Sequence, residues 1–252
     1  MFQSFRTNLA NNSAIIIITI GGINMNTLVY ALIAAGFIIQ ACFIAVEHKK
    51  KYVAADILKG TASLIFVIIG FMGLKKGFNP ETNTKIAIGL LFGMIGDILL
   101  NLRFVFEKIG QKIFLTGIVA FLIGHILYLV ALIPHCSHLA ASVIIGAILA
   151  AALLTYIFKT MEVKMAFKIF GIFYLGAVII MTVIALDAAF FSGSSSTAAV
   201  IYAIGAVLFT LSDIVLIFNT FSGVTRFSLR ITNLTLYYIG QILVAASLFF
   251  SR

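Results

Sequence analysis

Two aspartates inside long apolar stretches are the residues of this 252-residue chain whose chemistry must be explained first. Asp97 lies in Met94-Ile-Gly-Asp-Ile-Leu-Leu100, and Asp213 lies in Thr210-Leu-Ser-Asp-Ile-Val-Leu216. A charged side chain within a membrane span is costly and by default marks a functional site. Because a pair of carboxyl groups can act as general acid and general base, acid–base chemistry is the first hypothesis.

Further polar side chains in neighbouring apolar stretches could accompany the two aspartates. With a helical rise of about 1.5 Å per residue, they lie about 9 to 20 Å from loops that carry Lys and Arg. Their common depth predicts one polar cavity in the half of the membrane nearer those loops. The residues that we expect to bind or orient a substrate there are Lys59, Asn101, His125, Tyr128, Tyr238 and Gln241.

The elements that must position these residues are membrane-spanning helices. Of all residues, 62% are hydrophobic and only 10% are charged, which excludes a soluble or disordered chain. A spanning helix needs about 20 apolar residues, and we expect an all-α integral membrane protein with one eight-span domain over 26–252. Residues 1–25 are predicted to be a disordered or interfacial extension. The expected spans are 26–46, 53–73, 85–103, 112–133, 138–158, 167–187, 196–219 and 231–250.

An internal repeat relates the two aspartates. Asp97 and Asp213 are 116 residues apart, and so are His125 in Phe-Leu-Ile-Gly-His-Ile-Leu and Gln241 in Tyr-Tyr-Ile-Gly-Gln-Ile-Leu. An offset of four spans preserves the direction of each helix through the membrane. The sequence therefore predicts two parallel four-helix repeats, an arrangement found in some transporters, with Asp97 and Asp213 at one depth.

The net charge of +9 is read as a signal of membrane topology. Lys and Arg are concentrated in the loops after the first, third, fifth and seventh spans, which places these odd-numbered loops in the cytoplasm and both termini outside. The loop with Lys75, Lys76 and Lys85 argues for the opposite orientation. Basic loops also attract anionic headgroups, so no nucleic-acid partner is required. The expected location is a bacterial cell membrane.

Structural explanations compete for several of these residues. Asp56 and Lys59 are three residues apart on one helix and could simply pair with each other. His125 could be a contact between helices. The segment His135-Cys136-x-His138 has no further metal ligands nearby in the sequence, so neither a metal nor an organic cofactor is expected. The motifs G-x-S-x-G, H-E-x-x-H and the P-loop do not occur, which leaves carboxylate chemistry.

The sequence resembles the YhhN-type lysoplasmalogenases, which include the animal transmembrane protein 86 relatives. The resemblance covers roughly residues 26–250 and lies in short motifs that occur in the family's order. The family usually has proline after the lysine of the second span, where this chain has Gly60. The matching motifs are Lys59-Gly-Thr61, Gly96-Asp97, Phe121-Leu-Ile-Gly-His125-Ile-Leu-Tyr128, Leu211-Ser-Asp213 and Tyr237-Tyr-Ile-Gly-Gln241.

The resemblance implies an eight-span enzyme that hydrolyses the vinyl-ether bond of lysoplasmalogens, with a lysophospholipid as its partner in the bilayer. Asp97 and Asp213 are expected to be catalytic, as acid and base in an order that the sequence does not assign. Lys59 could keep one of them ionised or bind the lipid phosphate. Headgroup preference, chain-length preference and oligomeric state are left open.

Transport is the alternative function. Aspartates and a lysine within the membrane, together with parallel repeats, also describe a proton-coupled carrier of a small solute or lipid. A carrier must expose its central site to both faces in turn, whereas the sequence predicts few polar residues in the outer half of the membrane.

Overall fold

The computed structural model describes residues 25–192, 196–223 and 225–249, and these ranges contain helices and connecting loops without a strand. The predicted extension falls on residues that lie outside the described ranges, apart from Met25, which begins the first helix. The long helices are α2 (Met25–His48), α3 (Tyr52–Met72), α4 (Pro80–Leu102), α5 (Gly110–Leu132), α6 (Leu139–Thr160), α7 (Met165–Phe190), α8 (Thr197–Phe221) and α9 (Phe227–Ser247). Short 3₁₀ turns, η1 (Glu107–Ile109) and η2 (Ile133–His135), flank α5.

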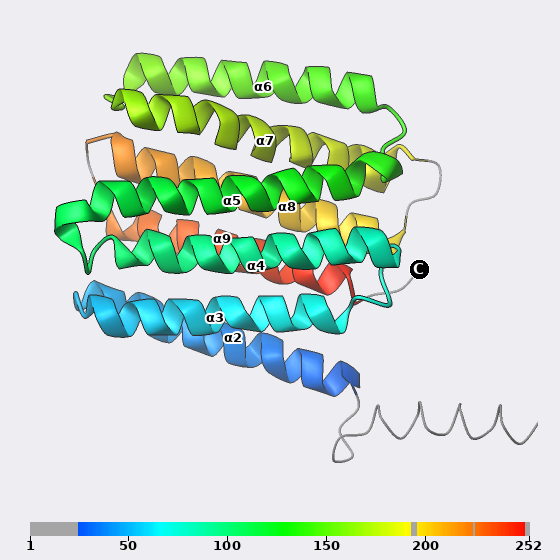
Figure 1. The fold of residues 1–252 in the computed structure, drawn as a ribbon, viewed down its shortest axis with the longest axis horizontal. Coiled ribbons are helices and arrows are strands. Elements are labelled where there is room, and N and C mark those ends of the chain that lie inside the picture. Colours follow the sequence, from blue (N-terminus) through cyan, green and yellow to red (C-terminus); the bar gives the residue numbers. More distant parts are fainter. Residues whose placement is uncertain (1–24, 193–195, 224, 250–252) are drawn as a thin grey trace, which may run out of the picture.

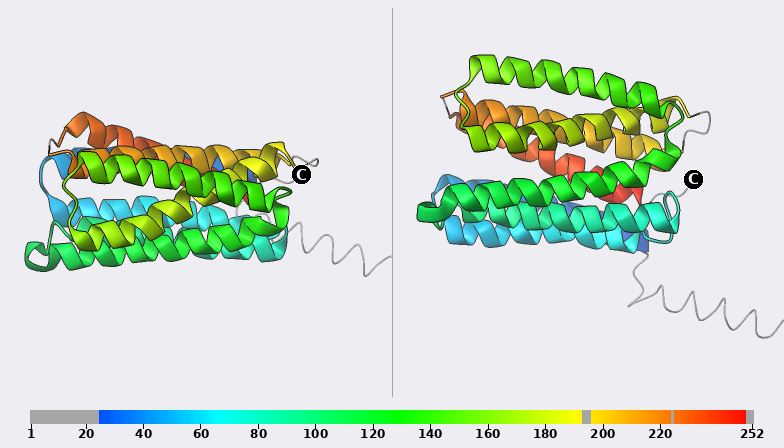
Figure 2. Two further views of the ribbon diagram at one scale, coloured as in Figure 1. Left: turned by 90° about the horizontal axis from the view of Figure 1, so that it is seen from above. Right: turned by 45° about the horizontal axis from the view of Figure 1, so that its top comes forward.

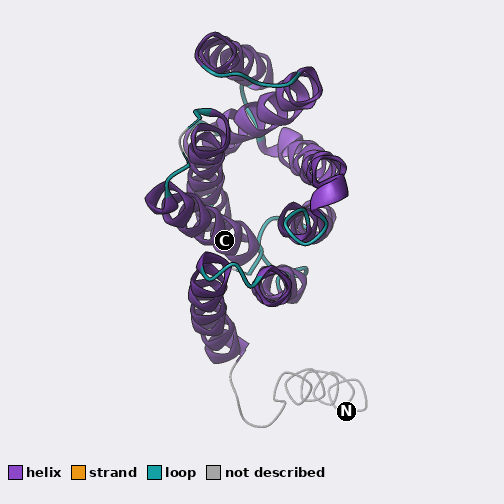
Figure 3. Cartoon of the chain, turned by 90° about the vertical axis from the view of Figure 1, so that its left-hand side faces the viewer, coloured by secondary structure: helices purple, strands orange, loops and turns teal. Residues whose placement is uncertain are grey.

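Successive helices run in opposite directions, so that the loops gather at the two ends of the bundle (Figure 1). The loops after α2, α4, α6 and α8 lie together at one end, on the left of Figure 1, and we call this the basic end because it carries most of the loop lysines and arginines. Figure 3 views the bundle from that end, with the helices nearly end-on.

The surface of the bundle is apolar, as a bilayer requires. Large side chains such as Ile38, Ile57, Ile148 and Phe173 are more than 60% exposed. Seven of the eight long helices, α2 to α8, are long and apolar enough to cross a membrane. The predicted all-α membrane fold is therefore confirmed. The eighth, α9, lies in the bundle but is less apolar than the others, and many of its residues, polar ones included, are buried inside the protein.

One helix begins earlier than the hydrophobicity pattern predicts. The expected third span starts at residue 85, whereas α4 begins at Pro80. The side chain of Asn79 accepts a hydrogen bond from Thr82 N at 2.9 Å, and proline is favoured in the first helical turn. The helix start is thus determined by capping chemistry five residues before the apolar run.

The arrangement of the helices follows the predicted repeat. Contacts of α3 with α4 and of α4 with α5 have counterparts in α7 with α8 and α8 with α9. The contact of α5 with α7 corresponds in the same way to that of α9 with α3. This pattern is that of two parallel four-helix units related by a pseudo-twofold axis along the bundle.

Glycines show the same relation at atomic detail. A Cβ atom added to Gly124 would lie 2.9 Å from the carbonyl oxygen of Gly89, and one added to Gly240 would lie 2.9 Å from that of Gly205. Gly89 and Gly205, like Gly124 and Gly240, are 116 residues apart. Both units therefore use a pair of glycines to bring two helix backbones into direct contact.

The units differ in the position of their first helix. α2 packs against α3 and also touches α9, while its counterpart α6 rests mainly on α7. Figure 2 shows α6 at the outer edge of the bundle. This displacement leaves room among α5, α6, α7 and α8, where the cavity described next extends.

Candidate functional site

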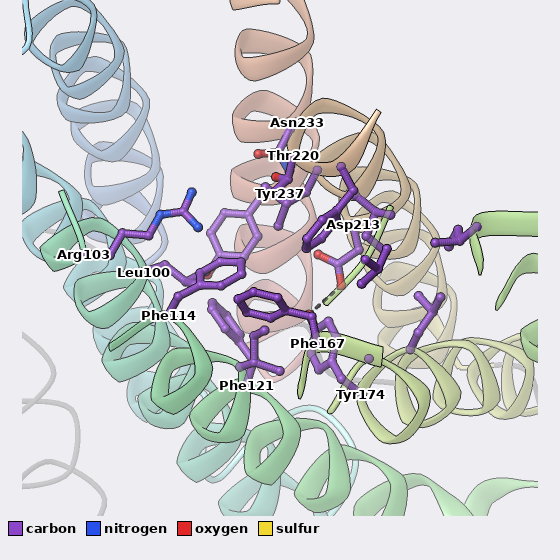
Figure 4. A pocket seen from close by; sticks show the side chains of 18 of the residues that line it. Leu100, Arg103, Phe114, Phe121, Phe167, Tyr174, Asp213, Thr220, Asn233 and Tyr237 are labelled. Atoms are coloured by element: carbon purple, nitrogen blue, oxygen red, sulfur yellow. Dashed lines mark hydrogen bonds between the residues drawn. The ribbon is translucent and has the colours of Figure 1, made fainter. Parts of the chain in front are cut away.

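A cavity of about 120 Å³ lies between the two units, and both aspartates belong to its wall. Figure 4 shows this cavity with Asp213 labelled. One water molecule needs roughly 10–15 Å³ by the same measure, so the space suits several waters or a slender chain. The predicted residues Lys59, Asp97, Asn101 and Asp213 line it. Residues from α3, α4, α5, α6, α7, α8 and α9 contribute to the wall.

Asp97 is held by three partners. Its Oδ1 lies 3.3 Å from Lys59 Nζ, and the side chains of this ion pair are only 4% and 5% exposed. Its Oδ2 accepts hydrogen bonds from Ser63 Oγ at 2.5 Å and from Tyr237 OH at 2.6 Å. The lysine also lies 4.2 Å from the centre of the Tyr237 ring. These contacts all favour the ionised carboxylate.

Asp213 has far fewer polar neighbours. Its Oδ2 accepts a hydrogen bond from Tyr174 OH at 2.5 Å, drawn as a dashed line in Figure 4. No Lys, Arg or His of the described ranges lies within 4 Å of it. The residue is 4% exposed. A carboxyl group buried without a cation is more stable in its neutral form, so its environment contrasts with that of Asp97.

Residues 116 apart line the cavity in matched pairs, which places it on the pseudo-twofold axis. In most of these pairs one partner is polar and the other is apolar. Two pairs are apolar in both units, and the aspartates form the one pair in this set that is polar in both, because each unit keeps the carboxyl group. The matched pairs are Lys59 and Leu175, Asp97 and Asp213, Leu100 and Leu216, Asn101 and Ile217, Phe114 and Arg230, Ile118 and Leu234, and Phe121 and Tyr237.

Away from the aspartates the wall becomes apolar. Leu154, Ile157 and Phe158 of α6 face Phe167 and Gly171 of α7 across this part of the cavity. A Cβ atom added to Gly171 would meet no other atom within 4 Å, so this glycine keeps space open. We call this part of the cavity, lined by residues of α6 and α7, the apolar arm.

The cavity reaches the basic end at two arginines, Arg103 and Arg230. Arg230 forms two hydrogen bonds with Glu47, from Nε at 3.0 Å and from Nη2 at 2.6 Å. Arg103 has no such carboxylate partner within the described ranges, and its guanidinium carbon lies 4.2 Å from the centre of the Phe114 ring. Burial lowers the pKa of Arg103 to about 10, so it stays charged at neutral pH.

Four of the predicted binding residues lie behind the cavity wall and do not line it: His125, Tyr128, Tyr238 and Gln241. His125 Nδ1 bonds to the carbonyl of Phe121, while Tyr238 OH donates to Ala62 O at 3.0 Å and ties α9 to α3. Gln241 Nε2 donates a hydrogen bond to Tyr237 OH at 3.4 Å, and Tyr237 OH in turn donates to Asp97. Buried polar atoms of His125, Tyr128 and Gln241 have no hydrogen-bond partner among the described residues.

Pairing of Asp56 with Lys59, the structural alternative from the sequence, is wrong. Lys59 makes its ion pair with Asp97, and no ion pair of Asp56 occurs in the described part of the chain. Asp56 is half-buried and is not part of the cavity wall. Of the two roles suggested for Lys59, proximity therefore favours keeping Asp97 ionised over binding a phosphate.

The aspartates have two partners that the sequence did not indicate, Ser63 and Tyr174, and a third, Tyr237, that it placed among the polar residues near them without a specific role. Ser63 follows Lys59 by four residues, so helical spacing could have placed both on one face. Tyr237 precedes the predicted Tyr238 and points to the other side of the same helix. Tyr174 belongs to α7, whose sequence offers no second polar group nearby at helical spacing. Only the packing of α7 on α8 brings it to Asp213.

The segment His135-Cys136-x-His138 lies in the loop between α5 and α6, at the end of the bundle opposite the basic end, and is held there by Asp187. Asp187 Oδ2 accepts from the backbone N–H of Ser137 at 2.6 Å, and Asp187 Oδ1 lies 2.9 Å from His138 Nδ1. These bonds fasten the loop between α5 and α6 to the end of α7. Within the described ranges no group of three His, Cys, Asp or Glu residues is arranged to hold a metal ion. Burial, and then Asp187, raises the pKa of the Cys136 thiol, which favours the thiol over the thiolate.

The comparisons with known proteins agree with the residues that carry the resemblance. The model of the YhhN family matches residues 54–248, which include every residue of the cavity wall. No curated protein matches the chain, and no solved structure matches it. Because the family match covers well over half of the sequence, this chain belongs to the YhhN family.

Proposed function

We propose that this chain is a membrane hydrolase that cleaves the vinyl-ether bond of lysoplasmalogens, giving a fatty aldehyde and a glycerophospho-headgroup. The observation that carries the proposal is the pair of buried aspartates on one cavity, one paired with a cation and the other without one. Membership of the YhhN family supports the same reaction class. The apolar arm of the cavity suits a single hydrocarbon chain.

The two carboxyl groups would divide the reaction between them. Asp213, neutral in its apolar surroundings, donates a proton to the β-carbon of the vinyl ether, and the electrons of the double bond form the new C–H bond. The resulting oxocarbenium ion is stabilised by the negative charge of Asp97. A water molecule then attacks the cationic carbon, and its proton passes to a carboxylate.

The hemiacetal formed in this way must still lose its alcohol. Breaking the bond between carbon and the glycerol oxygen gives the aldehyde, while the glycerol oxygen takes up a proton and leaves as a hydroxyl. The net change is the addition of one water, so the reaction needs no oxidant or reductant. Tyr237 and Ser63 hold Asp97 in place during both steps, and Tyr174 does so for Asp213.

The membrane orientation is part of the same proposal. The basic end lies in the cytoplasm by the distribution of Lys and Arg, and the cavity would then open toward the cytoplasmic leaflet. A lysolipid has one chain, which can occupy the apolar arm while the bond next to glycerol lies near the aspartates.

The test is aldehyde release from purified protein supplied with lysoplasmenylethanolamine. Loss of a general acid or base costs about 10²- to 10⁴-fold in rate, so Asp97→Asn and Asp213→Asn should each lose at least about 100-fold. Asp56→Asn is the matched control, because this half-buried carboxyl group lies outside the cavity wall, and it should keep its activity.

Near-normal turnover by folded Asp97→Asn and Asp213→Asn would disprove the assignment. If the unchanged protein releases no aldehyde but drives proton-coupled uptake of a solute into vesicles, the chain is a carrier instead.

A further inference from the structure

A group of hydrogen-bond donors at the basic rim of the cavity is left without an acceptor. Arg103 Nε and Asn101 Nδ2 are both buried, and neither has a hydrogen-bond partner among the described residues. Both side chains line the cavity and come from the same end of α4. A buried donor without an acceptor costs about 1–3 kcal/mol, so a ligand in the cavity that supplies acceptors to these two residues would be stabilised.

The charges around these donors select the kind of acceptor. Arg103 and Arg230 carry two positive charges, and Glu47 compensates one of them through its two bonds to Arg230. Lys59 and Asp97 neutralise each other deeper in the cavity. One positive charge therefore remains at the rim, and a ligand with a single negative charge would balance it.

The geometry of Arg103 suits a flat, two-oxygen contact. Its guanidinium carbon lies 4.6 Å from the centre of the Phe104 ring and 4.2 Å from that of Phe114. Rings near the guanidinium limit its motion and leave its N–H edges for an oxyanion. A Cβ atom at Gly110 would lie 2.8 Å from Arg103 O, so the start of α5 also packs closely against this residue. Figure 4 shows Arg103 extending toward the rings that line the cavity.

We infer that Arg103, with Asn101 and Arg230 beside it, forms a subsite for a phosphodiester monoanion at the mouth of the cavity. This inference deepens the proposed function and rests on it for the identity of the whole ligand, a single-chain glycerophospholipid. Asp97 lies six residues before Arg103 on the same helix, about 9 Å along its axis. In such a lipid only the glycerol backbone separates the phosphate from the bond to be cleaved, which matches this spacing.

The proposed subsite gives the two basic residues Lys59 and Arg103 different functions. Lys59 forms its ion pair with Asp97 inside the bundle, whereas Arg103 lies at the basic end and forms no ion pair with any residue of the described ranges. An enzyme built in this way distinguishes a phospholipid from a neutral alkylglycerol at a point remote from the reacting carbons.

The test measures binding and leaves catalysis aside. Purified protein in a maltoside detergent, which carries no phosphate, is titrated with 1-O-alkyl-glycerophosphocholine, whose saturated ether cannot be hydrolysed by the proposed route, and with 1-O-alkylglycerol. The unchanged protein should bind the phosphodiester lipid about 10- to 100-fold more tightly, the value expected for hydrogen bonds to a charged group. Arg103→Gln should remove most of this preference and leave the affinity for alkylglycerol unchanged.

Two further variants control for folding and for general charge. Arg103→Lys keeps the charge without the planar guanidinium and should keep part of the preference. Arg226→Gln removes an exposed arginine at the same end, outside the cavity wall, and should keep all of it. Free glycerophosphocholine, added as a competitor, shows whether the phosphodiester alone or a lipid headgroup is the ligand.

The outcomes separate this inference from the proposed function. If Arg103→Gln retains the preference, or if the unchanged protein has none, the subsite is wrong even where aldehyde is still released from the vinyl-ether lipid. If the preference exists and depends on Arg103, the subsite stands even where no aldehyde is formed, and only the reaction must then be revised.

Discussion

The two aspartates occupy equivalent places in the two units, yet their surroundings differ in almost every polar contact. Asp97 has a lysine, a serine and a tyrosine, whereas Asp213 has one tyrosine. The positions that match Lys59 and Ser63 in the second unit are Leu175 and Ile179. A symmetric frame thus holds two copies of one carboxyl group, one beside a cation and two hydroxyl donors and the other beside a single hydroxyl donor of the described residues.

Under the proposed function, this difference would let a repeat supply both an acid and a base. Two identical sites on a twofold axis would have equal proton affinities and would share their proton equally. Polar substitutions in one unit and apolar substitutions in the other remove that equality, as paired carboxylates with different environments do in other enzymes. The backbone contacts of the glycine pairs are kept in both units, so the cavity wall has diverged without a change in this helix packing.

The largest expected effect is a difference in thermal stability between the Asp97→Asn and Asp213→Asn variants. Asp97→Asn leaves the buried Lys59 charge unpaired and should destabilise the protein by about 3–5 kcal/mol. Asp213→Asn removes no ion pair of the described residues and should melt close to the unchanged protein, although both variants should lose aldehyde release. Thermal denaturation in detergent, measured alongside aldehyde release, gives the comparison.

A double substitution checks the cause. Lys59→Met alone should be as destabilising as Asp97→Asn, and Lys59→Met combined with Asp97→Asn should recover most of the stability without any activity. If the single and double variants melt at the same temperature, the Lys59–Asp97 ion pair is not the cause of the stability difference between the two Asp→Asn variants.

A smaller effect is expected from the two tyrosines. Tyr174→Phe removes the hydrogen bond that Asp213 accepts from this tyrosine, so the rate of aldehyde release should fall about 10-fold, the upper end for a bond between uncharged groups. Tyr237→Phe should cost less, because Ser63 and Lys59 still hold Asp97. Equal losses in the two variants would argue against different roles for the aspartates.

The smallest effect concerns the apolar arm that the displaced α6 leaves open. Gly171→Leu places a side chain in the cavity without a backbone clash and should weaken the use of long-chain substrates by about 10-fold, with short chains less affected. Gly176→Leu is the matched control, since this glycine lies on the same helix with equally open surroundings but does not line the cavity. The measurement is KM as a function of the length of the substrate's hydrocarbon chain in both variants. An equal loss in both variants would mean that the hydrocarbon chain does not occupy the apolar arm.

Sequence reasoning predicted the helices, the repeat and the central pair of aspartates because each has a one-dimensional signal. Apolar runs of about 20 residues predict spans, and the 116-residue offset between Asp97 and Asp213 predicts their equivalence. The start of α4 was expected too late, since hydrophobicity does not register the cap at Asn79. The roles predicted for His125, Tyr128, Tyr238 and Gln241 stay predictions, and these residues lie behind the cavity wall.

The sequence by itself determined that this chain is an α-helical membrane protein with two carboxyl groups at matched positions. Burying a charged group in hydrocarbon is so costly that its position in a span is informative without a structure. The tertiary structure decided which side chains surround each carboxyl group. Helices α3 and α9 bring Lys59 and Tyr237 to Asp97, while α7 brings Tyr174 to Asp213. Spacing along one helix can predict its own faces, but the contacts between helices depend on how the whole bundle packs.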